Sequence, residues 1–191
     1  MEVAEKTQQK WTNELGSPRQ LNWTDIYARI YDSTDDRSLR WLQYQCVHRI
    51  LPTNRLLHLY KLVDSDKCRF CPMYRENVTH LFWHCPESRA FWRSCSQILG
   101  LPVLKRDCVL FGTNAGGSLH IQLNAVILLA KQCIWACRLR DVAVSMQCFL
   151  KRLDAYLAVE KYVYCIRDKR ELFNERWSQI QRKVKAALSQ L

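Results

Sequence analysis

Large apolar side chains recur at every third or fourth position along most of the chain, which is the spacing of one face of an α-helix. The first clear stripe runs from Trp23 to Tyr31, and Asn22 or Thr24 is suited to cap a helix there. The same spacing predicts further helices over residues 37–51, 55–62, 87–99, 120–139, 142–163 and 169–191. Joined by short turns, these elements predict an all-α helical bundle.

A few stretches allow more than one interpretation. Residues 11–15 fit either a short helix or an extended arm, with a turn at 16–18. Residues 108–112 form a short apolar piece that fits a strand or a helix, and the polar, glycine-containing stretch 113–118 predicts a mobile loop. Residues 120–139 are apolar on nearly every face, which is typical of a central buried helix.

One stretch between the helices has the spacing of a metal site. Cys68 and Cys71 are separated by two residues, His80 follows after eight more, and Cys85 after another four. A Cys-x2-Cys turn brings two thiolates onto one ion, and a nearby His and Cys complete a tetrahedral Zn²⁺ site. His84 rivals Cys85 as the fourth ligand, because residues 80 and 84 would share a helix face. The alternative is a set of buried free cysteines with a hydrogen-bonded histidine.

The metal motif divides the chain into three regions. We expect an N-terminal helical arm or linker over residues 1–36, a zinc-binding region flanked by helices over 37–99, and a C-terminal helical bundle over 100–191. A helical turn over 78–83 would present His80, and Pro86 suits the first turn of the next helix. The bundle is therefore expected to hold one small CCHC zinc-binding insert.

Cysteine usage and hydropathy indicate the compartment. The chain has ten cysteines among 191 residues, and its polar start lacks the apolar run of a secretory signal peptide. We therefore expect a reducing, intracellular setting, nucleus or cytoplasm, in which the cysteines outside the motif serve as small buried side chains. The most apolar run, 125–130, is much shorter than the roughly 18 residues of a membrane span, so no membrane partner is expected.

The charge is unevenly distributed. The formal net charge is +11, and residues 1–66 hold nine basic and nine acidic side chains while residues 67–191 hold 20 and nine. A basic excess that begins at the metal motif favours a polyanionic partner such as nucleic acid, although it also fits a plain solubility surface. The residues expected to contact nucleic acid surround the motif: Lys67, Arg69, Phe70, Arg75, Arg89 and Arg93.

Catalytic motifs are not found in the sequence. There is no P-loop, no Gly-x-Ser-x-Gly elbow and no His-Glu-x-x-His. Residues 31–36 (YDSTDD) resemble a polymerase Tyr-x-Asp-Asp turn only loosely, since the carboxylates lie one residue too far along. Four ligands are typical of a closed structural zinc site, and Glu76, the one candidate base beside it, is expected to be a solvated loop carboxylate. We therefore expect a protein that is not an enzyme.

The motif and its flanks together resemble a known family, the C-terminal zinc-binding region of reverse transcriptases from LINE-type non-LTR retrotransposons. A lead-in of basic and apolar residues and the closing His-Leu-Phe-x-x-Cys-Pro segment, 80–86, carry the likeness. The residues of the lead-in and of the helix that follows the motif are His48, Arg49, Thr53, Arg55, Leu56, Phe91 and Trp92.

The resemblance implies a zinc module that lies downstream of a polymerase palm and thumb and contacts RNA or target DNA. It implies Cys68, Cys71, His80 and Cys85 as the zinc ligands and a reverse transcriptase core as a further partner. No palm or endonuclease motif occurs in this chain, so polymerase activity is not implied. Two other hypotheses stay open at this stage: a zinc-stabilised structural or protein-interaction domain, and an enzyme subunit that works only with a polymerase core.

Overall fold

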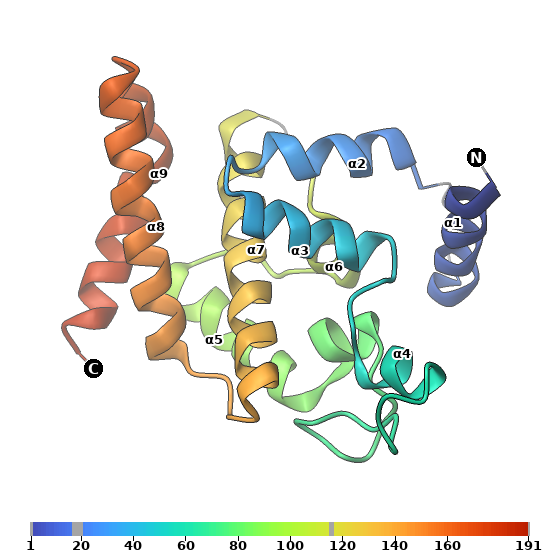
Figure 1. Cartoon of the computed structure of the whole chain (residues 1–191). Coiled ribbons are helices and arrows are strands. Elements are labelled where there is room, and N and C mark those ends of the chain that lie inside the picture. Colours follow the sequence, from blue (N-terminus) through green and yellow to red (C-terminus); the bar gives the residue numbers. More distant parts are fainter. Residues whose placement is uncertain (1, 17–20, 115–116, 191) are drawn as a thin grey trace.

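The computed structural model describes residues 2–16, 21–114 and 117–190, and their regular structure is helical. Within these residues there is no strand, and the only pairing of extended backbone is an isolated antiparallel bridge between Lys67 and Arg75. The prediction of an all-α protein is confirmed. The helices, shown in Figure 1, are α1 Glu2–Leu15, α2 Trp23–Asp32, α3 Arg37–Val47, α4 Asn54–Leu59, the π-helix η1 His80–His84, α5 Pro86–Leu99, α6 Arg106–Phe111, α7 Gly117–Arg140, α8 Met146–Ile166 and α9 Arg170–Leu188.

Helix α7 is the centre of the packing. It contacts α3, α8 and α9, and it runs through the middle of the molecule in Figure 1. Residues Leu119–Arg140 are long and apolar enough to cross a membrane by length and composition alone, but 61% of their most apolar window is buried within the protein. That burial agrees with the prediction of a central core helix over 120–139.

Helices α8 and α9 lie side by side as an antiparallel pair (Figure 1). Phe149 and Leu153 of α8 and Trp177 of α9 are at most 1% exposed, and both helices also contact α7. Helix α8 begins at Met146, four residues later than predicted, because Asp141 adopts a left-handed φ of 56° and the chain turns before Ser145 caps the helix. Residue 191, at the end of the predicted last helix, lies outside the described residues.

Helix α1 is fixed to the core by one tryptophan. Trp11 is 1% exposed, its Nε1 donates to the Val47 carbonyl at 2.7 Å, and its ring meets Phe111 edge-on at 5.0 Å. The Arg49 guanidinium lies 4.4 Å from the indole centroid and pairs with Glu14. Of the two interpretations of residues 11–15, the helix is therefore right, and it is longer than expected.

The sequence fixes several helix ends through side-chain caps. The Asn22 side chain accepts from the Asp25 N–H, as predicted, and Asp36 caps α3. Helix α3 ends at Val47, four residues before the predicted end, because Arg49 takes a left-handed φ of 59°. Of the ambiguous piece 108–112, residues 108–111 are helical and belong to α6, and Gly112 ends the helix with a φ of 80°. Residues 17–18 of the predicted turn and 115–116 of the predicted loop lie outside the described residues.

Candidate metal centre

Four buried side chains converge between α4 and α5. Cys68 Sγ lies 3.9 Å from Cys85 Sγ, and Cys85 Sγ lies 3.7 Å from Cys71 Sγ. His80 Nε2 lies 3.1 Å from Cys71 Sγ, and all four candidate ligand atoms fall within 4.8 Å of one another. Three sulfurs and one imidazole nitrogen, shielded from water, form a donor set that could hold a metal ion.

A tight loop supplies the first two thiols. The Cys68 N–H donates to the Tyr74 carbonyl at 2.8 Å, and the Met73 N–H donates to the Cys71 carbonyl at 2.6 Å. The bridge between Lys67 and Arg75 closes the base of this loop. The Cys-x2-Cys turn is therefore held by its own backbone hydrogen bonds, which aim both sulfurs at one point.

The π-helix supplies the other two ligands. The Cys85 N–H donates to the His80 carbonyl at 2.7 Å, five residues back, which is the π-helical pattern. The predicted helical turn is thus present, but it is wider than an α-helical turn. This wider turn brings Cys85 into the cluster and leaves His84 exposed, so the rival ligand set with His84 is not the one assembled here.

Two side chains of α5 donate hydrogen bonds to backbone carbonyls of the π-helix η1, which is called the π-turn below. Ser88 Oγ donates to the Leu81 carbonyl, and Trp92 Nε1 donates to the Phe82 carbonyl at 2.7 Å. A buried carbonyl without a donor is destabilising, so these bonds compensate for the irregular turn. Trp92 is 4% exposed and is therefore a core residue that positions the metal loop.

Glu76 is buried, so the prediction of its exposure from the sequence was wrong. It was expected to be a solvated loop carboxylate, but it is 0% exposed and accepts from Arg138 of α7, with Nε at 3.0 Å and an Nη at 2.7 Å from Oε1. The Asn54 and Arg69 backbone N–H groups also donate to this carboxylate, at 2.8 and 3.1 Å. Since Arg69 lies between the two loop cysteines, the carboxylate ties the metal loop to the central helix.

Contacts among the three thiols give them different pKa values. The hydrogen bond with Cys85, followed by burial, raises the pKa of Cys68 to about 12. The contact with Cys68 lowers the pKa of Cys85, and burial raises the pKa of Cys71. Cys85 is therefore the most acidic of the three thiols, and a metal ion that bound all three as thiolates would displace their protons.

Most of the residues predicted to contact nucleic acid are accessible. Lys67, Arg69 and Arg75 lie exposed on the metal loop, and Arg89 and Arg93 lie exposed on α5. Phe70 is half-buried and packs against both the metal cluster and the main core, so most of its ring is committed to packing.

Tyr74, His84 and Arg106 also lie at this surface, although none of them was predicted there from the sequence. Tyr74 is 56% exposed at the loop tip, its ring 5.6 Å from that of His80. His84 is exposed, and half-buried Arg106 lies near it. Partial burial of the imidazole, and next the nearby guanidinium, lower the pKa of His84. Arg106 could not be found from sequence spacing, because α6 meets the metal region only in the folded chain.

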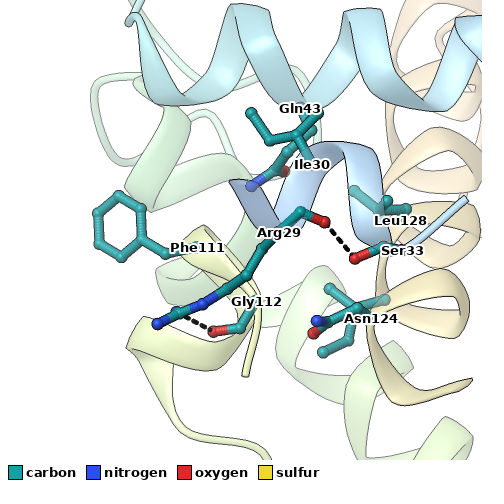
Figure 2. Close-up of a pocket in the computed structure, with 9 residues that line it drawn as sticks. Arg29, Ile30, Ser33, Gln43, Phe111, Gly112, Asn124 and Leu128 are labelled. Atoms are coloured by element: carbon teal, nitrogen blue, oxygen red, sulfur yellow. Dashed lines mark hydrogen bonds between the residues drawn. The ribbon is translucent and has the colours of Figure 1, made fainter. Parts of the chain in front are cut away.

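The cavity shown in Figure 2 is too small to be an active site. It lies between α2, α3, α6 and α7 and has a volume of about 10 Å³. Arg29 lines it and donates through Nη1 to the Gly112 carbonyl at 3.3 Å, while its buried Nε has no partner among the described residues. A space of this size accommodates one water molecule.

No protein-family model matches the chain, and no curated protein matches it at a significant level. The resemblance to reverse transcriptase zinc-binding regions therefore remains a prediction from the motifs.

Proposed function

We propose that this chain is a non-catalytic zinc module that binds nucleic acid, the role implied by its resemblance to the C-terminal segment of LINE-type reverse transcriptases. Its partners would be single-stranded or structured RNA, or target DNA, and a reverse transcriptase core. The predicted intracellular location, nucleus or cytoplasm, belongs to the same proposal.

Zinc is the metal that the cluster fits best. Zn–S bonds of about 2.3 Å in a tetrahedron place two sulfurs about 3.8 Å apart. Cys85 Sγ lies 3.9 Å from Cys68 Sγ and 3.7 Å from Cys71 Sγ. The 3.1 Å between Cys71 Sγ and His80 Nε2 would open by about half an ångström in the same tetrahedron. Cys68, Cys71, His80 and Cys85 would then close the coordination sphere, as in a structural site.

The observation that carries the nucleic-acid proposal is the unpaired positive charge beside this centre. Among the described residues, Arg75 pairs with Asp66 at 2.8 Å, whereas Lys67, Arg69, Arg89 and Arg93 form no ion pair. Exposed cations without acidic partners are available to phosphates, and the nearby exposed Tyr74 offers a ring for stacking on an unpaired base.

The test combines metal content with binding of fluorescently labelled single-stranded RNA at two salt concentrations. We expect one zinc per chain and an affinity that falls steeply with salt, because each neutralised phosphate releases counterions. Arg69→Glu combined with Arg89→Glu should abolish binding, whereas Lys151→Glu on α8, which reverses one exposed charge away from the loop, should have little effect. A flat salt response, or an unchanged affinity in the double variant, would refute the proposal.

A specific feature also supports the alternative of a protein-interaction domain. Leu59, Tyr60 and Leu62, at and beyond the end of α4, are 72%, 66% and 69% exposed, and Met73 on the metal loop is 69% exposed. Exposed apolar side chains gathered near one element are typical of protein-binding surfaces. One zinc per chain without RNA binding would favour this alternative.

A further inference from the structure

A larger pocket lies far from the metal motif in sequence, between α8, α9 and the link from α2 to α3. Its volume is about 170 Å³, compared with about 10 Å³ for the cavity in Figure 2. The Tyr156 hydroxyl donates to Thr34 Oγ1 at 3.2 Å, and Arg167 lies 3.7 Å from Asp35. These two contacts hold the link against α8, so the pocket is formed by tertiary packing of distant segments.

Two donors on adjacent residues of α9 lack partners here. Trp177 is 1% exposed, and its Nε1 has no hydrogen-bond partner among the described residues. The same is true of the buried Nε of Arg176, whose Nη1 donates to the Tyr164 hydroxyl. Both residues line the pocket. Buried donors are almost always paired in native proteins, so the pair indicates an acceptor that the chain itself does not supply.

The pocket also presents an acceptor. Glu160 of α8 lines it, half-buried and close to the Tyr156 hydroxyl. A ligand that meets Arg176, Trp177 and Glu160 together must therefore carry both acceptors and donors on its edge.

The charges and the walls restrict the ligand further. The charged residues that line the pocket balance in sign: Asp32, Asp35, Glu160, Arg167, Lys169 and Arg176. A multiply charged anion such as free phosphate therefore gains little there. Of the nine other residues that line it, four are aromatic, three are aliphatic and two carry hydroxyls; the aromatic ones are Tyr31, Tyr156, Tyr164 and Trp177. Aromatic walls with a few polar groups suit a flat, uncharged heterocycle.

We propose that this pocket binds a nucleobase, in the intact protein an unpaired base of the bound nucleic acid. In that setting the inference rests on the proposed function. The base would lie against the aromatic walls and donate an exocyclic amine or ring N–H to Glu160. The Trp177 Nε1 and Arg176 Nε donors are covered in this structure, so the two side chains would turn toward the base to donate to its acceptors. Arg40 covers one face of the Tyr31 ring and Arg176 one face of the Tyr164 ring, so only the opposite faces are free for stacking. Extruded bases are held in pockets of this kind by stacking and by hydrogen bonds to their edges.

The test uses free nucleosides, which carry no phosphate and so do not engage the basic surface. Adenosine, guanosine, cytidine and uridine would be titrated into the full chain by calorimetry and by saturation-transfer NMR. We expect at least one to bind in the micromolar to millimolar range. Trp177→Phe keeps an aromatic side chain but removes the N–H donor and part of the ring area, and it should weaken binding by about tenfold. Trp41→Phe, at a 57% exposed position on α3, is the matched control and should bind as wild type does.

A second variant keeps the test decisive if Trp177→Phe fails to fold. Glu160→Gln keeps an acceptor oxygen but removes the charge, and it should change the order of preference among the four nucleosides. Absence of binding by all four, or unchanged binding in both pocket variants, would overturn the inference.

The two proposals fail in different ways. RNA binding that is salt-sensitive, with no nucleoside binding, would leave the proposed function standing and refute the pocket assignment. Nucleoside binding lost in Trp177→Phe, without any binding of RNA or DNA, would establish the pocket as a nucleoside site and refute the nucleic-acid function.

Discussion

The buried ion pair between Glu76 and Arg138 gives the sharpest stability prediction. Arg138→Met would leave a carboxylate that is 0% exposed with only the Asn54 and Arg69 backbone donors. Removing one partner of a fully buried pair is destabilising by about 3–5 kcal/mol, because the other charge stays buried and uncompensated. Domains of ordinary stability unfold with about 5–15 kcal/mol, so this loss is a large fraction of the total.

The measurement is urea denaturation of the wild type, Arg138→Met, Glu76→Gln and the double variant. Because each single variant leaves an unpaired group, the double variant should lose less free energy of unfolding than the sum of the two singles. Arg75→Met is the control, since Arg75 forms an exposed pair with Asp66 and should cost less than about 1 kcal/mol. A loss in Arg138→Met as small as that of the control would refute the assignment of this pair as buried and structural.

Three further predictions follow from other contacts. Cys68→Ser should abolish metal binding and unfold at least the metal loop, because structural zinc contributes about 10–16 kcal/mol of apparent binding free energy in zinc-finger peptides. If amide exchange showed a folded loop in a chain without metal, the assignment of the metal site would be wrong. Trp11→Ala should lower the free energy of unfolding by about 3–5 kcal/mol in urea titration through cavity formation, whereas an exposed α1 would make it neutral. Burial lowers the pKa of Lys131 below its ordinary 10.5, so the contribution of this one group to the free energy of unfolding rises as pH rises toward 10.5. The stability of the wild type relative to Lys131→Met should therefore increase over this range in urea titrations, and a constant difference between the two would contradict it.

Sequence reasoning succeeded where the information is local. The three-and-four spacing of apolar residues identified most helices, and the cap at Asn22 and the proline in the first turn of α5 depend only on adjacent residues. The cluster of Cys68, Cys71, His80 and Cys85 was also predictable, because a short loop and one helical turn bring the four side chains together.

Features made by distant residues were not predictable in the same way. Glu76 is buried because Arg138, 62 residues away, reaches it from α7. The early end of α3 depends on Arg49, whose contacts with Trp11 and Glu14 hold its left-handed backbone in place. The pocket of about 170 Å³ likewise needs α8, α9 and the α2–α3 link, which no single stretch of sequence contains.

The π-turn at His80–His84 has a consequence for how such centres are searched for in other genomes. The turn accommodates one residue more than an α-helical turn does, since its closing bond spans five residues instead of four. Positions four apart in an α-helix also share a face. A chain one residue shorter between its histidine and last cysteine could therefore present the same two ligands from an ordinary α-turn. A sequence pattern that demands four intervening residues would overlook such chains, so the spacer should be allowed to hold three or four.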